Sequence, residues 1–372
     1  MVTPTLLAIK PPATPPMVTV TLGISVKATL LPSQVGVGST DMGLLSLGKL
    51  GTARRQTSQP HTIEWDKVTY IVGDGVDGFA RPIQRMDFLR LSEGPEARAM
   101  TYASLGLTLG AGGQHSVAIM VGLPVEVMIN TPLAKETRKG LREWLVGRHV
   151  FTLDRQETIV EVTGVDVMAQ PAGSLLAWGM NDEGVWVRDP QDLESPTLIC
   201  DVGFNTLDLF AIQKREITLK FTDGEREGIR RAAEMLMETI RSRYDVQVTR
   251  LQADAYLRSS SPIFTYAGGS EDLTPYIQQA LDSTAAQIGD FVETKVGNGR
   301  QFRRILFTGG GAELLRGYLT KRYPHGEVVP QAVMANAHGL ARAARIKWAD
   351  QAAVVGLDPG FGGFKLVALV TE

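Results

Sequence analysis

The pattern of apolar and polar positions switches repeatedly between the period of a strand and that of a helix, which predicts an α/β fold. The run from Met17 to Pro32 is rich in β-branched residues, as is typical of a strand. Thr131 and Pro132 open an amphipathic stretch that Gly147 ends, which predicts a helix with proline in its first turn. The first half is expected to contain strands at 17–32, 116–123, 149–155 and 158–169, a hairpin at 61–73, and helices at 96–110, 133–147 and 173–178.

The second half continues the alternation after a polar segment at 181–196, whose two prolines indicate a domain boundary. We expect one domain from residues 17–194 with 350–372 and a second from 195–349. Residues 1–16 contain five prolines and are expected to form a flexible tail. The predicted elements are strands at 197–203, 207–213, 303–308, 326–330, 353–360 and 365–371, and helices at 226–244, 273–296, from about 312, and 334–350.

Composition narrows the class of protein. A length of 372 residues favours two domains over one core. The net charge of −2 gives no electrostatic footprint for a polyanion, so direct nucleic-acid binding is not expected. The single cysteine cannot form an internal disulfide, which favours the cytoplasm. The most apolar stretch, Ser116–Ile129, contains Pro124 and Glu126 and is too short to span a membrane.

Two segments share one design: an apolar strand, an aspartate, a glycine-rich turn and a second strand. The first contains Asp201 and Asp208, and the second contains Asp358 and Lys365. Such a turn presents amides to a phosphate chain, and glycine permits both positive φ and close approach of the backbone to an anion. An aspartate at the strand end can hold waters of a hydrated Mg²⁺ ion. Two such hairpins facing each other would hold one polyphosphate from both sides.

A third glycine motif, Thr308–Gly311, lies between a buried strand and a helix that begins near Ala312. Without side chains there, a flat base or ribose can lie against the backbone, with helix amides facing the ligand. Each motif alone is weak evidence, because a glycine turn after an aspartate is more often an ordinary surface hairpin. Three of them in one chain favour a nucleotide site.

The three glycine motifs resemble the phosphate-1, phosphate-2 and adenosine motifs of the actin-like ATPase superfamily. Phosphate 1 matches Asp358–Lys365, phosphate 2 matches Asp201–Asp208, and the alanine-rich helix from Asn336 is similar to the second interdomain connector. The residue sequences of both hairpins, and of segments 121–126 and 167–177, are similar to those of the ParM-type actins of bacteria and archaea. The resemblance covers nearly all of 17–372. It implies a two-domain, ribonuclease-H-like actin fold with ATP or ADP and Mg²⁺ as ligands.

The order of the motifs departs from that family, whose members begin with phosphate 1. Here phosphate 1 comes last, and the strand expected to follow it lies near Met17. The resemblance therefore implies a circularly permuted actin-like fold. If the fold is intact, the new termini lie together at the end of one hairpin, where a break disturbs few buried contacts.

The resemblance also implies roles for individual residues. Asp201 and Asp358 would face Mg²⁺ through water and act in catalysis with Gln170, which stands where the family places the residue that orients the attacking water. The alternative for Gln170 is that it caps the following helix. Lys365 would contact the β- or γ-phosphate, and Phe364 stands where many relatives have a small polar residue. The remaining residues expected to bind the nucleotide are Gly203, Asn205, Thr206, Asp208, Gly309, Gly310, Gly311, Ala312, Gly360, Phe361, Gly362 and Gly363.

By resemblance, the protein would hydrolyse ATP in an interdomain cleft and assemble with itself into nucleotide-dependent filaments. Plasmid segregation or another cytoskeletal task would be its role, with an adaptor protein as a further partner. The alternative is a monomeric phosphotransferase or chaperone-like ATPase of the same superfamily. A phosphotransferase needs a catalytic aspartate aimed at a substrate hydroxyl, which the motifs do not show, and a chaperone needs a further substrate-binding domain.

Overall fold

The computed structural model describes residues 23–38, 59–80, 94–225, 228–360 and 362–372. The chain forms two compact units, and the smaller one is made mainly of 186–336, joined by 124–126. The expected tail at 1–16 lies outside the described residues. In the described part of the chain, no helix is long and apolar enough to cross a membrane.

The larger unit is built on a mixed sheet that the described residues form with nine strands. Its order is β1 (Ile24–Leu31), β17 (Phe364–Thr371), β16 (Ala353–Pro359), β5 (Gln114–Leu123), β7 (Gln156–Ala169), β6 (Gly147–Leu153), β3 (His61–Trp65), β4 (Val68–Val72) and β2 (Val35–Val37). β16, β5 and β7 are parallel, whereas β17 runs antiparallel to both β16 and β1. The last two strands of the chain therefore lie within the sheet, between β1 and β5.

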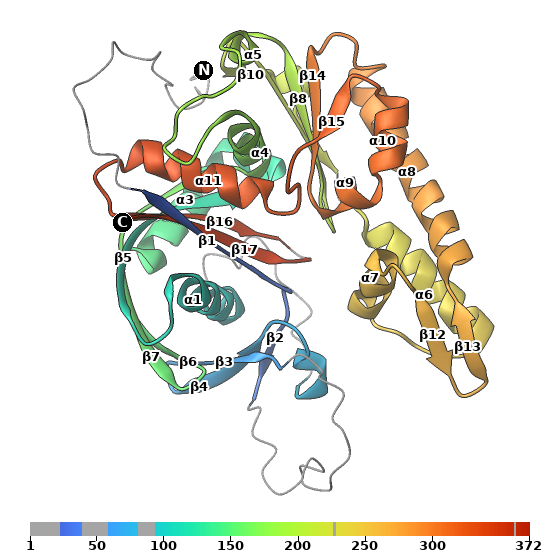
Figure 1. Cartoon of the computed structure of the whole chain (residues 1–372), viewed down its shortest axis with the longest axis horizontal. Coiled ribbons are helices and arrows are strands. Elements are labelled where there is room, and N and C mark those ends of the chain that lie inside the picture. Colours follow the sequence, from blue (N-terminus) through green and yellow to red (C-terminus); the bar gives the residue numbers. More distant parts are fainter. Residues whose placement is uncertain (1–22, 39–58, 81–93, 226–227, 361) are drawn as a thin grey trace, which may run out of the picture. The chain divides into compact units, whose positions relative to one another are not determined.

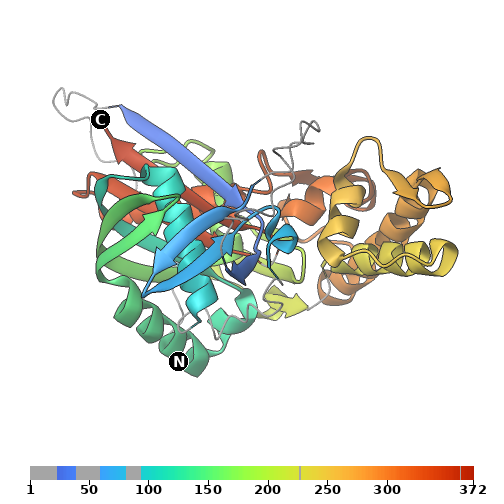
Figure 2. The same cartoon turned by 90° about the horizontal axis from the view of Figure 1, so that it is seen from below.

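Helices cover both faces of this sheet. The sheet curves around α1 (Pro95–Leu109), whose Met100 and Leu105 are fully buried in the core (Figures 1 and 2). On the other side, α11 (Ala335–Lys347) lies directly on β16, where a Cβ at Gly356 would come within 2.2 Å of the Ala337 carbonyl oxygen (Figure 1). The other helices here are η3 (Val76–Gly78), α2 (Val125–Ile129), α3 (Thr131–Leu145) and α4 (Gln170–Gly179).

The smaller unit has a second mixed sheet, in the order β10 (Glu216–Ile217), β9 (Leu207–Gln213), β8 (Thr197–Val202), β14 (Arg304–Thr308) and β15 (Gly326–Val328), with β11 (Asp223–Glu225) also on β9. β8 is antiparallel to β9 and parallel to β14. A separate hairpin joins β12 (Ile263–Tyr266) to β13 (Gly269–Asp272). The helices are α5 (Gln191–Glu194), η5 (Leu219–Phe221), α6 (Arg230–Tyr244), α7 (Arg250–Arg258), α8 (Thr274–Val296), α9 (Gly310–Leu314) and α10 (Arg316–Arg322).

Apart from the short segment 124–126, the chain passes between the units at Val185–Trp186, within the polar segment 181–196, and at Asn336–Ala337. The sequence grouped the whole of 195–349 together, whereas most of α11 belongs to the larger unit. The reason is that α11 packs closely against β16 at Gly356. The predicted strands and long helices are present where the structure describes the chain. Helix α7, the β12–β13 hairpin and the short elements β2, α2, α5, β10 and β11 were not predicted.

Candidate functional site

The C-terminal hairpin places an acidic and a basic side chain opposite each other. Asp358 on β16 pairs in register with Lys365 on β17, and Lys365 Nζ lies 2.8 Å from Asp358 Oδ2. Asp358 is 1% exposed, whereas the Lys365 side chain keeps 15% of its surface. The turn is closed by the Gly360 N–H, which donates to the Gly363 carbonyl at 3.2 Å. Phe361 lies outside the described residues.

In the C-terminal hairpin turn, a close backbone contact and not a left-handed conformation requires glycine at Gly360. Gly203, Gly360 and Gly363 all lack a positive φ, so the positive φ that glycine permits is not used at these positions. A Cβ at Gly360 would lie 2.8 Å from the Gly363 carbonyl oxygen, and one at Gly363 would lie 2.7 Å from Leu30 Cδ1. Phe364 is fully buried in the core, so it offers no polar group to a ligand.

Gln170 is the first residue of α4, and its side chain reaches the C-terminal hairpin. Its Nε2 donates to Asp358 Oδ1 at 2.6 Å and to the Pro359 carbonyl at 3.3 Å. The residue before it, Ala169, caps the helix without a side-chain hydrogen bond. The structure therefore brings Gln170 and Asp358 together, and the Gln170 side chain binds the carboxylate rather than the first turn of α4.

The second hairpin joins β8 to β9 and places Asp201 directly opposite Asp208. Its turn is closed by the Gly203 N–H, which donates to the Thr206 carbonyl at 2.9 Å. Asn205 Oδ1 is buried and accepts no hydrogen bond from the described residues. A buried amide oxygen without a donor costs free energy, so a water or a ligand group is expected to donate to it.

The chain that enters α6 supports this turn from behind. The backbone N–H groups of Ile229 and Arg230 donate to the carbonyls of Gly203 and Phe204, at 3.1 and 2.8 Å. The approach is so close that a Cβ at Gly228 would lie 2.4 Å from the Gly203 oxygen. The turn is therefore held by a close backbone contact, and a change in the shape of the turn would displace the start of α6.

Asp208 is buried, and burial is the main reason why its pKa rises from 3.8 to about 8. The charge of Asp201 raises the pKa further, while hydrogen bonds from the Thr206 side chain and the Val125 backbone act in the opposite direction. The raised pKa favours the protonated form of the Asp208 side chain at neutral pH.

The triple glycine lies beside Asp201 because β14 runs parallel to β8, with Thr308 next to Asp201 in register. Gly309 has φ of 86°, and a Cβ there would lie 2.4 Å from Asp201 Oδ1. At Gly309 positive φ and close approach both demand glycine. Gly311 packs against Val202 in the same way, with a Cβ contact of 2.6 Å.

Two residues near these motifs were not identified from the sequence. Asn336 is buried in the first turn of α11, and its Nδ2 donates to Asp201 Oδ2 at 2.6 Å. Arg258, at the end of α7, donates from Nη1 to the Gly310 carbonyl at 3.0 Å and from Nε to Asp254 at 2.9 Å. The signal for Asn336 was its place as a polar residue among alanines, whereas Arg258 lies on a helix that was not predicted.

The predicted residues thus fall into two groups, one in each unit. The larger unit holds Gln170, Asp358, Gly360, Gly362, Gly363 and Lys365, and the smaller holds Asp201, Gly203, Asn205, Thr206, Asp208, Gly309, Gly310, Gly311 and Ala312. Cys200 precedes Asp201 in the buried strand, and burial raises the pKa of its thiol, which makes it an inert side chain.

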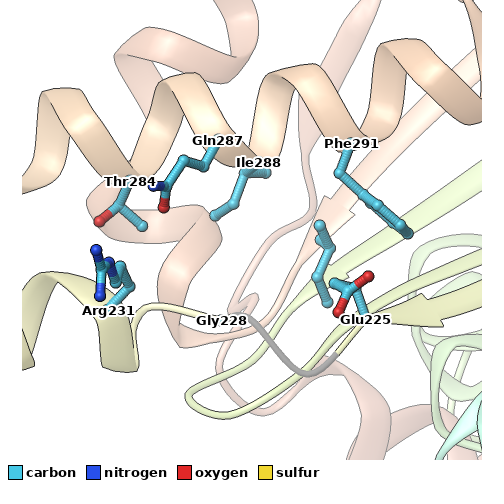
Figure 3. A pocket seen from close by; sticks show the side chains of 8 residues that line it. Glu225, Gly228, Arg231, Thr284, Gln287, Ile288 and Phe291 are labelled. Atoms are coloured by element: carbon cyan, nitrogen blue, oxygen red, sulfur yellow. The ribbon is translucent and has the colours of Figure 1, made fainter.

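A small pocket lies behind the second hairpin, between α6, α8 and β11 (Figure 3). At one end Arg231 points toward Thr284, and at the other Glu225 lies near Phe291 (Figure 3). Its volume of about 30 Å³ has room for about two water molecules. The pocket is therefore too small for a nucleotide, and the hairpin turns remain the candidate site.

Two family models match the chain. The model described as Actin like proteins N terminal domain matches residues 18–173, and the model described as Archaeal actin homologue MreB-like, C-terminal, matches 199–321. Together these matches cover most of the chain. No curated protein sequence matches it.

Solved structures show the same fold. The apo ParM protein of pSK41 is 17% identical with a TM-score of 0.62, over 86% of this chain and 91% of that one. The archaeal actin homolog Ta0583 in complex with ADP is 17% identical with a TM-score of 0.64, over 87% and 99%. A 15-stranded ParM filament from Clostridium botulinum is 17% identical with a TM-score of 0.65, over 85% and 92%. The chain therefore belongs to the actin-like proteins and has their two-domain fold.

Proposed function

We propose that this actin-like protein hydrolyses ATP and uses the nucleotide to control its own assembly into filaments. In this proposal both hairpins hold the phosphates of one Mg²⁺-ATP. One observation carries the proposal. In each hairpin an aspartate lies at the end of a buried strand and accepts a 2.6 Å hydrogen bond from a side-chain amide, Gln170 for Asp358 and Asn336 for Asp201. Phosphoryl transfer depends mainly on positioning and charge stabilisation, and each of these carboxylates is held in one direction.

The residues present fit a hydrated magnesium ion. Mg²⁺ keeps several of its waters and is commonly held by one or two carboxylates together with phosphate oxygens. Among the described residues there is no cluster of three or more His, Cys, Asp or Glu side chains that would form a full protein cage. Asp201 and Asp358 would each hold the ion through water. When bound, the cation neutralises charge on the phosphate oxygens.

The hairpin turns supply groups for the phosphates. Lys365 would contact the β- or γ-phosphate through the part of its side chain that stays exposed while it is paired with Asp358. In the turn between β8 and β9, no described residue donates to the buried Asn205 Oδ1, and a water bound to the nucleotide or cation would donate to it. Protonated Asp208 adds no negative charge there at neutral pH.

Gln170 would orient the attacking water. Since its Nε2 is held by Asp358, the direction of the amide is fixed, and its Oε1 is the acceptor that remains on the same group. An acceptor fixed in this way can hold a water by one of its O–H bonds. The role is positioning, which supplies most of the catalysis in phosphoryl transfer.

Filament formation and its purpose rest on the relatives. One similar structure is a 15-stranded ParM filament and another is an Alp12 filament. We propose that this chain assembles with itself when it binds ATP, and that hydrolysis weakens the polymer by changing contacts between two states. The task would be plasmid segregation or another cytoskeletal role, with an adaptor protein as partner.

We also propose that the motif order is a circularly permuted form of the family's order. Two contacts support this: β17 is paired with β1 along its whole length, and the Glu372 N–H donates to the Gly23 carbonyl at 3.0 Å. The end of β17 thus lies beside the start of β1. A chain in which 350–372 precede residue 23 should keep the fold and bind the same nucleotide.

Phosphate release and sedimentation with ATP, with ADP and without nucleotide test the function. We expect ATP turnover, and pelleting that depends on the nucleotide. Turnover without assembly would favour a monomeric phosphotransferase or chaperone-like ATPase. Wild-type turnover by Asp201→Ala would show that the proposed metal site is wrong.

A further inference from the structure

Asp201 is held on two sides by the smaller unit. One oxygen, Oδ2, accepts the 2.6 Å hydrogen bond from Asn336 Nδ2, and Asn336 is 5% exposed. The other oxygen, Oδ1, lies against the backbone of Gly309, where a Cβ would come within 2.4 Å. The carboxylate therefore cannot rotate without breaking a buried hydrogen bond or colliding with the glycine.

The same device recurs in the larger unit. Asp358 receives Gln170 Nε2 at 2.6 Å, and Gln170 is the first residue of α4. Asn336 lies in the first turn of α11. Each phosphate-hairpin aspartate thus receives an amide N–H from the first turn of a helix far along the chain. In both hairpins, which share one design, a buried amide therefore holds the aspartate carboxylate in one direction.

We propose that Asn336 is a positioning residue for Asp201. This inference rests on the proposed function. Asn336 would touch neither nucleotide nor cation, and it would act by keeping Asp201 aimed at the waters of Mg²⁺. Outer partners that orient a metal-binding carboxylate commonly change metal affinity by roughly 10- to 100-fold when removed.

The position of Asn336 in the chain adds a second consequence. It is the last residue of the smaller unit before the chain crosses at Ala337 and continues as α11. The bond that orients Asp201 therefore also anchors the start of α11. Cation binding at Asp201 should strengthen this anchor, so it should slow hydrogen exchange of backbone amides in the first turns of α11.

The test uses nucleotide binding by the full chain, measured with a fluorescent ATP analogue in Mg²⁺ and in EDTA. Asn336→Leu removes the donor at similar volume, and Asn336→Ser is a smaller variant in case leucine disturbs folding. The matched control is Thr222→Val in the same unit, which removes a buried hydroxyl that accepts from the Ala211 N–H and donates to the Thr218 carbonyl. Thermal melting without nucleotide shows that each variant is folded.

We expect Mg²⁺ to tighten binding to the wild type and to Thr222→Val. In the two Asn336 variants this gain should fall about 10-fold or more, while binding in EDTA stays near the wild-type value. The slowing of exchange in α11 by Mg²⁺-nucleotide should be lost in parallel. An undiminished Mg²⁺ gain in folded Asn336 variants would overturn the positioning role alone. A wild-type chain that binds no nucleotide would overturn the proposed function and this inference with it.

Discussion

Gln170 and Asp358, 188 positions apart in the chain, are joined by a 2.6 Å hydrogen bond between buried side chains. The bond links the first residue of α4 to the end of a strand that comes almost last in the sequence. The bond fixes the direction of both the Asp358 carboxylate and the Gln170 amide, and it forms without a ligand. Catalysis by positioning depends on groups that are held in the required direction before the substrate binds.

Gln170→Ala should lower kcat for ATP hydrolysis about 10- to 100-fold, because positioning of the water is lost while the phosphate contacts remain. KM for ATP should change little. Steady-state phosphate release measures both. Gln301→Ala is the control, since that amide donates to the Val296 carbonyl at 2.8 Å and lies outside the site. A raised KM with unchanged kcat would mean that Gln170 only binds the nucleotide.

Lys365→Met should destabilise the fold, because it leaves the Asp358 carboxylate buried without its cation. Breaking a fully buried pair costs roughly 3–5 kcal/mol, and we expect about 2–3 kcal/mol because the lysine side chain keeps 15% exposure. Urea unfolding gives the free energy. Asp358→Asn combined with Lys365→Met should recover part of the loss, since no buried charge remains. A double variant no more stable than the single one would contradict this.

The stability of the chain should fall as pH rises toward about 8, through Asp208. Its pKa rises from 3.8 to about 8 on folding, so the folded chain binds the proton more tightly across that window. Raising the pH through it therefore costs stability, and the loss ends above about 8. Asp208→Asn should remove this slope. Urea unfolding without metal or nucleotide, at several pH values, checks it, and parallel slopes in both proteins would refute the assignment.

Gly339→Ala should disrupt the contact between α11 and α4. A Cβ at Gly339 would lie 1.6 Å from the Gly173 carbonyl oxygen, so the two helices would have to move apart. We expect a loss of about 3 kcal/mol in unfolding free energy. Gly317→Ala is the matched control, because a Cβ there meets nothing within 4 Å. Equal stability of the two variants would show that the helices do not pack this closely.

The hairpins could be predicted from the sequence because their signals are local: a strand, an aspartate and a glycine turn within a few residues. The alternation of patterns likewise predicted the strands and the long helices. Long-range placement could not be predicted in this way. The Asn336–Asp201 bond joins residues 135 positions apart, and no local feature of an alanine-rich helix shows which carboxylate it meets.

The assignment of α11 to a unit failed for a similar reason. Sequence order groups this helix with the strands before it, whereas the missing side chain of Gly356 lets it lie on β16. Helix α7 is only nine residues long, too short to show a clear helical period, so it was not predicted, and Arg258 was missed with it. The glycine turns were located correctly, but their reason is close packing more than backbone conformation.

Calorimetric titration of the chain with ATP in Mg²⁺, for the wild type, Asp201→Asn and Asp358→Asn, tests whether both hairpins hold one nucleotide. If both hairpins hold one nucleotide, the wild type should bind one ATP per chain, and either substitution alone should remove most of the Mg²⁺-dependent affinity. Two ATP molecules per chain, or a single variant that keeps the wild-type affinity, would contradict a shared site.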